Sequence, residues 1–304
     1  MTSKAQNIEI QDESLENHLG YQLRRVAVLL QADLTAALKE LQLIPTAAAI
    51  MLVLANKENI IQVELARMLG LQRTNISPLI VSLEKRGFLS RSNLDGRSQS
   101  VQLTAQGLAK IQGIQVQLDR HSKDCFAQLS RAEILNLEEV VKSTQGVLDQ
   151  KQKNSDDMGV GEQFSYQLLR TSSLAMSKLV KALAPLKLIP GNASAMLTIA
   201  NNPGVIQSEL GRSLGIKRAN ISTLISELKE RKLVSVKSEG RAQLLYLSEA
   251  GQVLIKQIEH TFDCHETNCF SHLDEVKIKE AVNSLYSIRQ RLVKNKQLRR
   301  AGQK

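Results

Sequence analysis

Between residues 69 and 86 the chain places apolar and polar positions with the spacing of a helix that has one buried face. The apolar positions are Ile76, Leu79, Ile80 and Leu83. The opposite face carries polar side chains of modest size, Arg73, Thr74, Asn75, Ser77 and Ser82. Residues 62–69 give a second short helical pattern, and Gly70 stands where that helix must end and turn. Two short helices joined by a tight glycine turn predict a helix-turn-helix.

A hairpin pattern follows the helix-turn-helix. The polar turn at residues 92–97 contains an Asp-Gly pair, and residues 100–103 then alternate between polar and apolar side chains. We therefore expect a small β-hairpin, or wing. Residues 59–61 are expected to add a brief third strand to it, and the small aliphatic residues 47–55 to form the buried helix at the centre of the domain.

The whole pattern occurs twice. Residues 75–77, Asn-Ile-Ser, return as residues 220–222, an offset of 145 residues. Past the wing the offset becomes 144, as between Gly107 and Gly251, so the second wing is one residue shorter. A repeat of this length indicates a duplicated domain, because solenoid repeats are far shorter.

Long amphipathic patterns flank each helix-turn-helix. One helix is expected to begin at Ser14 and run past Leu38, and another to run from Ala105 to Leu129. A last helix has apolar residues three or four positions apart between Ile134 and Leu148, which is typical of a coiled-coil-like seam. A winged helix needs no such helices for itself, so they indicate a dimerisation layer. The predicted fold is mainly α with small β-wings: two winged helix-turn-helix domains that long terminal helices join into an intramolecular pseudo-dimer, monomeric as a chain.

The repeat sets the expected domain limits. Residues 150–161 are polar, without apolar period, and join the copies; at ~3.5 Å per residue they reach roughly 40 Å. The limits are a disordered lead at 1–13, a first domain at 14–149, the linker, a second domain at 162–298 and a basic tail at 299–304. Below, residues 14–149 and 162–298 are called copy 1 and copy 2.

The charge and composition of the chain indicate which kinds of partner and which compartment it suits. The net charge of +10 suits a polyanionic partner, but residues 1–150 hold 16 basic and 16 acidic side chains, so the excess lies wholly in the second half. Seven basic residues fall within the last sixteen positions, which suits either a solvated helix end or a phosphate-contacting arm. The polar amino end and the lack of a long apolar run lead us to expect a cytoplasmic protein.

The polar face of the second helix is the candidate site. Asn75 and Asn220 can bind adenine through two hydrogen bonds, and Arg73 and Arg218 can reach guanine or phosphate. The alternative is that all four are merely exposed polar residues near a helix start, and we favour DNA contact. Further candidates for DNA contact are Thr74, Ser77, Pro78, Lys217, Ser222 and Thr223. Pro78 should cost little hydrogen bonding near a helix start. Because Thr223 replaces Pro78 and Ala219 replaces Thr74, we expect unequal half-sites about one helical turn apart.

The order of elements resembles the MarR family of bacterial transcription regulators. The resemblance rests on residues 61–66, 71–77, 83–89, 95–97 and 101–107, and on their counterparts in copy 2. It implies a dimer of winged helices on a palindromic operator, most simply a repressor that occludes a promoter, with double-stranded DNA and a small-molecule effector as partners. It also implies minor-groove contacts by the wing-tip residues Arg97 and Arg241. Members of the family usually have one domain per chain, and this chain departs from them by carrying two.

Other chemistry has little support. His121 and Cys125 recur as His265 and Cys269, a spacing open to zinc ligation or redox sensing, but both cysteines lie on an apolar stripe, so core packing is expected. Cys264 stands beside His265. No catalytic constellation, metal site or cofactor motif is expected, and the protein is predicted not to be an enzyme. The alternative function is a winged-helix scaffold that binds another protein and no longer reads DNA, which the neutral first half favours.

Overall fold

The computed structural model describes residues 13–57, 59–71, 73–93, 99–149, 164–240 and 242–301. Residues 1–12 of the lead predicted at 1–13, the linker and the wing-tip residues 94–98 and 241 lie outside the described residues, whereas Glu13 begins α1. The described chain is mainly helical and forms two compact units. The larger unit holds residues 22–175 and 272–304, and the smaller unit holds the chain up to residue 21 together with residues 176–271.

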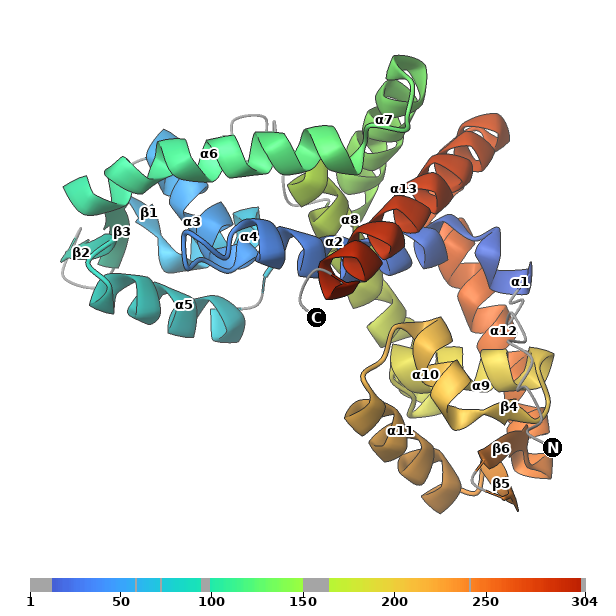
Figure 1. The fold of residues 1–304 in the computed structure, drawn as a ribbon. Helices are drawn as coiled ribbons and strands as arrows, with labels where there is room; N and C mark the ends of the chain where they lie inside the picture. The colour runs from blue at the N-terminus through green and yellow to red at the C-terminus, as the bar shows by residue number, and fades with distance from the viewer. Residues whose placement is uncertain are drawn as a thin grey trace. The chain divides into compact units, whose positions relative to one another are not determined.

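The two copies of the repeat give the same order of elements, apart from α1 in copy 1 and the short η1 in copy 2 (Figure 1). Copy 1 forms α1 (Glu13–Glu16), α2 (Leu19–Ala37), α3 (Pro45–Asn56), β1 (Ile60–Ile61), α4 (Gln62–Met68), α5 (Arg73–Lys85), β2 (Leu89–Asn93), β3 (Gln99–Leu103), α6 (Ala105–Cys125) and α7 (Arg131–Leu148). Copy 2 forms α8 (Phe164–Leu183), the 3-10 helix η1 (Ala184–Leu186), α9 (Pro190–Asn201), β4 (Val205–Ile206), α10 (Gln207–Leu214), α11 (Arg218–Glu230), β5 (Val234–Glu239), β6 (Ala242–Leu247), α12 (Glu249–Phe270) and α13 (Glu275–Ala301). The predicted fold class is confirmed.

The central helices α3 and α9 begin at a proline. Pro45 and Pro190 stand in the first turn, where a missing N–H costs nothing and the fixed φ suits a helix. Nine residues of each helix are buried. Each central helix is therefore the core against which its helix-turn-helix and wing pack.

The wing sheets have three antiparallel strands each, in the orders β1-β3-β2 and β4-β6-β5. In the first sheet Ile60 pairs with Val101, and Leu89 pairs with Leu103. In the second sheet Val205 pairs with Leu245. The brief third strand predicted from residues 59–61 and its counterpart in copy 2 are thus confirmed.

A threonine or serine joins each wing to the long helix that follows. The Thr104 hydroxyl accepts a hydrogen bond from Gly107 N at 3.1 Å and donates one to Gly87 O at 2.6 Å. Ser248 caps α12 in the same way through Gly251 N, at 3.1 Å. Each hydroxyl caps its helix and also links the helix to the wing.

Two predicted helix bounds are wrong. The helix expected from Ser14 breaks before Leu19, because the Glu266 carboxylate accepts hydrogen bonds from Leu19 N at 2.5 Å and Gly20 N at 3.2 Å and so caps a new helix start. The helix expected to reach Leu129 ends at Cys125, since Ser130 and Glu133 form a capping box that begins α7.

The larger unit contains the long helices of both copies. Helices α7 and α13 contact each other along their apolar faces (Figure 1). Their buried positions are Leu137, Val141, Thr144 and Leu148 on α7, and Ala281, Leu285, Ile288 and Leu292 on α13. The terminal helices therefore join copy 1 to copy 2 within one chain. None of the helices in the described ranges has the length and apolarity that crossing a membrane requires.

Candidate nucleic-acid interface

The turn of each helix-turn-helix is built on a left-handed glycine. Gly70 has φ +65° and Gly215 has φ +68°, values that side-chain-bearing residues rarely adopt. Leu71 N donates to Ala66 O at 2.8 Å, and Ile216 N donates to Gly211 O at 2.8 Å. These backbone bonds close the end of the first helix and direct the chain into the second.

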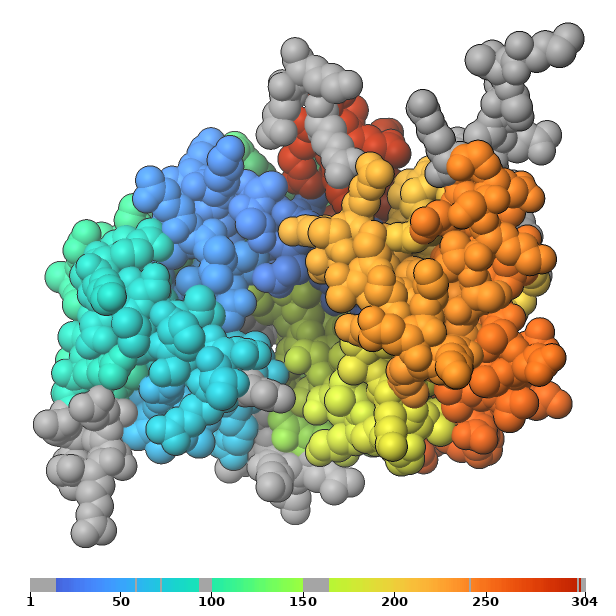
Figure 2. All heavy atoms as spheres, turned by 90° about the horizontal axis from the view of Figure 1, so that it is seen from below, coloured from blue at the N-terminus to red at the C-terminus, as the bar shows by residue number. Residues whose placement is uncertain are grey.

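The second helix of each motif buries one face and exposes the other, as the sequence predicted. Helix α5 buries Ile76, Ile80 and Leu83, and α11 buries Ile221, Leu224, Ile225 and Leu228. The candidate residues Arg73, Thr74, Asn75 and Pro78 are exposed on α5, with Ser77 half-buried. Lys217, Arg218, Asn220, Ser222 and Thr223 are exposed in the second copy. Helix α5 lies open on the face shown in Figure 2, where it is cyan.

The starts of these two helices favour an anionic partner. Neither α5 nor α11 has an acidic residue in its first turn, and each begins with an arginine. Lys217 precedes α11 without capping it through its side chain, so the first backbone N–H groups of that helix point outward without a side-chain acceptor. Free N–H groups, the helix dipole and a guanidinium together form an anion-binding end.

Two of the candidate residues have structural constraints that the sequence did not show. The Ser222 hydroxyl accepts a hydrogen bond from Gln207 Nε2 at 3.0 Å and donates to Arg218 O at 3.3 Å, so it ties α10 to α11. Pro78 stands inside α5 rather than in its first turn, so it removes the backbone bond to Thr74 O, and the expectation that it costs little is wrong. Helix α11 has no such interruption at Thr223, so the two exposed faces differ in backbone as well as in side chains.

The wings carry the two remaining candidates. Arg97 and Arg241 lie outside the described residues. The second hairpin is paired up to Glu239 and Ala242, which leaves two residues for the connection and matches the shorter loop predicted from the offset. Lys237 lies over the Tyr246 ring at 5.1 Å on the same hairpin.

One basic residue after each second helix has a structural role that sequence analysis missed. Arg86 donates to Gln42 O at 2.9 Å, and Arg231 donates to Lys187 O at 2.7 Å. Both acceptors belong to residues with a left-handed backbone, at φ 54°. The offset of 145 between the two arginines was the available signal, because it places a basic residue at the same position of both copies.

The histidine and cysteine pairs behave as core residues. Cys125 and Cys269 are buried, and burial raises the pKa of the Cys125 thiol to about 12 and that of Cys269 to about 11. Such thiols are protonated at neutral pH, so the low-pKa redox-sensor alternative is wrong for these two. His265 lies 3.5 Å from Cys269 Sγ, but the described part of the chain holds no group of three ligands that suits a metal. Cys264 is exposed.

Comparison with known proteins supports the assignment of both copies. Residues 43–98 and residues 186–243 each match the MarR family. A search of curated proteins gave no match.

Solved structures of single-domain length resemble part of the chain. A MarR family transcriptional regulator from Rhodococcus sp. RHA1 is 23% identical over 43% of this chain and 94% of its own, with a TM-score of 0.41. CouR from Rhodococcus jostii RHA1, bound to p-coumaroyl-CoA, is 25% identical over 46% of this chain and 96% of its own, with a TM-score of 0.39. The S. aureus MepR–DNA complex is 19% identical over 41% of this chain and 94% of its own, with a TM-score of 0.39.

The two family matches fall in the same part of each repeat, over the central helix, the helix-turn-helix and the first strands of the wing. The family consists of transcription regulators rather than enzymes. With both copies folded as winged helices and joined through their terminal helices, the two family matches support a tandem MarR arrangement within this one chain.

Proposed function

We propose that the chain binds double-stranded DNA in a sequence-specific manner and regulates transcription. The observation that carries this proposal is the exposed Arg-x-Asn sequence at an acid-free helix start in both copies, at Arg73 and Asn75 and at Arg218 and Asn220. An arginine can bind guanine or phosphate there, and an asparagine can bind adenine through two hydrogen bonds. Thr74, Ser77, Lys217 and Thr223 line the same faces and add further contacts, while Ser222 positions α11.

The proposed operator is a pseudo-palindrome with unequal halves. Thr74 and Pro78 of copy 1 are replaced by Ala219 and Thr223 in copy 2, and Pro78 interrupts the backbone hydrogen bonds of α5 alone. Each helix therefore presents different groups to a major groove, and half-sites about one helical turn apart would suit them. Arg97 and Arg241 would enter the minor groove from the wings.

The proposed mode is repression by occlusion of a promoter in the bacterial cytoplasm, relieved by a small-molecule effector as the family relationship suggests. The proposed domain limits are those of the sequence repeat, with copy 1 at residues 14–149 and copy 2 at residues 162–298. The chain would act alone, because its terminal helices already join two winged helices.

Selection from a random DNA duplex pool tests the proposal. The wild-type chain should enrich one paired, unequal site, and the Asn75→Ala/Asn220→Ala variant should lose it, since each bidentate contact is worth ~1–3 kcal/mol of discrimination. Enrichment of equal halves would refute the asymmetry. Failure of a folded, monodisperse sample to enrich any site at low salt would refute DNA reading.

A protein-interaction scaffold is the second candidate, and the electrical neutrality of residues 1–150 favours it. Salt separates the two functions. Phosphate contacts release counterions and give a steep fall of affinity with salt, and docking to a protein gives a shallow one.

A further inference from the structure

Among the residues that the structure describes, four ion pairs between copy 1 and copy 2 in the larger unit have the same polarity. Copy 1 supplies the carboxylates Asp33, Asp124, Glu139 and Asp149. Copy 2 supplies the cations Arg299, Arg291, Lys277 and Arg170, in the same order. The direction matches the charge of the two halves, since residues 1–150 are neutral and the excess of basic residues lies in the second half.

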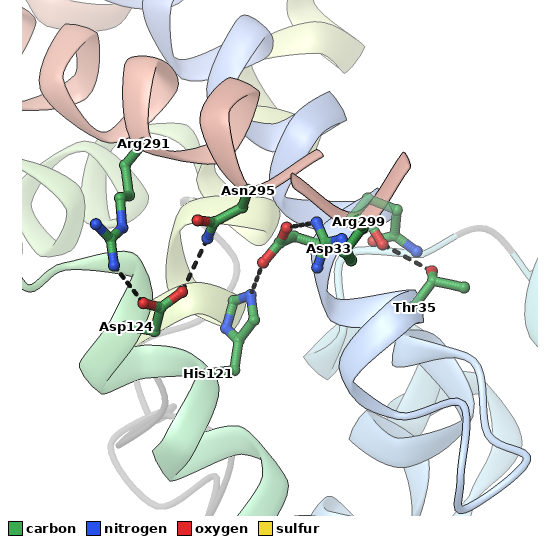
Figure 3. Close-up of polar contacts among 8 residues, drawn as sticks. Asp33, Thr35, His121, Asp124, Arg291, Asn295 and Arg299 are labelled. Atoms are coloured by element: carbon green, nitrogen blue, oxygen red, sulfur yellow. Dashed lines mark hydrogen bonds and ion pairs between the residues drawn. The ribbon is translucent and has the colours of Figure 1, made fainter. Parts of the chain in front are cut away.

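Asp33 is the most buried of these carboxylates, with its side chain 5% exposed. It lies between Arg299 of α13 and His121 of α6, whose Nε2 is 3.0 Å away (Figure 3). Burial lowers the pKa of His121 to about 4, so this imidazole is neutral near pH 7. The positive charge that balances Asp33 therefore comes from copy 2, through Arg299.

Asp124 is held from the same helix one and two turns earlier. Arg291 and Asn295 of α13 both donate to its carboxylate, Asn295 Nδ2 at 2.8 Å (Figure 3). The hydrogen bond from Arg291 lowers the pKa of Asp124 below its usual value. The last three described turns of α13 therefore bind α2 and α6 of copy 1 through ion pairs and hydrogen bonds.

Arg170 of α8 makes the fourth pair from a buried position. Its guanidinium donates to Asp149 Oδ2 at 2.7 Å and to Gln145 Oε1 at 2.8 Å. Gln145 Nε2 in turn donates to Thr171 Oγ1 at 2.8 Å. One hydrogen-bond network therefore joins the copies, and it consists of Gln145 and Asp149 at the end of α7 with Arg170 and Thr171 of α8.

The repeat shows what other pairings would cost. At the positions of the four carboxylates, copy 2 has Lys178, Asn268, Asn283 and Val293. A pairing of copy 2 with copy 2 would lose all four carboxylates and would set Arg299 against Lys178. In a pairing of copy 1 with copy 1, Glu139 would meet Glu133, the counterpart of Lys277, and Asp124 would meet Val147, the counterpart of Arg291.

We propose that this one-way charge pattern makes the interface heterotypic, so that copy 2 recognises copy 1 and rejects a second copy 2. Like charges at matching positions are a known means of excluding wrong partners. The smaller unit has a contact in the other direction, His18 with Asp263 at 3.5 Å, in which the Asp263 side chain is 68% exposed. Glu139 is exposed to a similar extent, at 61%. Exposed pairs contribute little, so the selectivity rests mainly on Asp33 and Asp149, whose side chains are 5% and 16% exposed. The inference concerns pairing and does not depend on DNA binding.

Cleavage between the copies tests partner choice directly. A protease site is inserted within residues 150–161 of the full chain, the folded protein is cut, and native mass spectrometry follows the two fragments at equilibrium after dilution. We expect 1:1 complexes of unlike fragments and no pair of copy 2 fragments. A mixture of like and unlike pairs in the proportions of random association would overturn the proposal.

Charge reversal in the intact chain provides a second test that does not require the fragments to stay soluble. Lys277→Glu with Arg291→Asp should lower the thermal stability of the chain and speed hydrogen exchange in α13. The equilibrium constant for unfolding should rise by about a factor of five for each exposed pair. Adding Glu139→Lys and Asp124→Arg should restore both measurements. The matched control is Lys279→Glu with Lys294→Glu, which changes the same charge at two exposed lysines of the same helix and should have a smaller effect.

The rescue separates charge recognition from packing. A reversed pair of cations that is not rescued by the reversed acids, or a control that destabilises as much as Lys277→Glu with Arg291→Asp, would overturn the proposal.

Discussion

Gly107 and Gly251 offer the sharpest test of how each long helix is seated on its wing. A methyl group added at Gly107 would lie 2.2 Å from Phe88 O, and one added at Gly251 would lie 2.2 Å from Leu233 O. Both oxygens belong to the backbone, and Phe88 O already accepts a hydrogen bond from Thr104 N at 3.1 Å. An alanine at either position must therefore push the helix away from the strand.

The size of the effect follows from the geometry. An ordinary contact begins at 3.4 Å, so the separation of 2.2 Å must grow by at least 1.2 Å, which opens the junction that Thr104 or Ser248 closes. Overpacking of this kind costs ~1–3 kcal/mol, and the loss of a helix cap costs ~1 kcal/mol. The higher helix propensity of alanine returns up to ~1 kcal/mol. The net destabilisation by Gly107→Ala or Gly251→Ala should be about 2–3 kcal/mol.

The control is Gly146→Ala in α7, where an added methyl group meets nothing within 4 Å. This variant should raise the free energy of unfolding by ~0.5–1 kcal/mol, because alanine loses less backbone entropy in a helix. Urea unfolding of the three variants measures the difference. If Gly107→Ala and Gly251→Ala were as stable as Gly146→Ala, the close seating of the helix on the wing would be refuted.

Three further outcomes are expected. Burial lowers the pKa of His121 and of His265 to about 4, so between pH ~6.5 and ~4 the unfolded chain binds protons that the folded chain does not. The free energy of unfolding should therefore fall as the pH is lowered through that window. Unfolding measured at a series of pH values should show a smaller fall in the His121→Gln/His265→Gln variant. Cys264 should be alkylated rapidly in the folded protein and Cys125 and Cys269 only on unfolding, and mass spectrometry that found either buried thiol modified first would contradict the core assignment. Arg231→Met should lower the free energy of unfolding by ~1–2 kcal/mol, because the hydrogen bonds to Lys187 O and Leu186 O are lost. The salt dependence of DNA affinity should not change. If the slope of log affinity against log salt concentration fell by ~1, Arg231 would be shown to contact phosphate.

The local patterns of the chain were sufficient to predict most of the fold. The helix-turn-helix, the wing and the central helix are each marked by an apolar periodicity, a glycine or a proline, which locates the element to within a few residues. The sequence repeat shows each of these patterns twice. The break before Leu19 could not be predicted, because its cause is Glu266, a residue distant in sequence. The helix end at Cys125 was missed for a different reason, since the Ser130–Glu133 capping signal is local but was outweighed by a continuing apolar stripe.

The sequence was sufficient to predict which residues of the candidate site are exposed, but less so to predict the role of each residue. Sequence periodicity separates Ile76 from Asn75, and the structure places them accordingly on buried and exposed sides. It cannot show that the hydroxyl of Ser222 is engaged by Gln207, or that Arg86 is bound to a loop carbonyl, because both facts depend on elements that approach only in three dimensions.

The capping of α2 by Glu266 has a consequence for the order in which the protein is made. Leu19 leaves the ribosome before its hydrogen-bond acceptor, which is synthesised 247 residues later. The larger unit likewise needs α13, which supplies the cations for Asp33 and Asp124. Copy 1 therefore cannot complete its native contacts while it is being translated, because the smaller unit needs residues up to 271 and the larger unit needs α13.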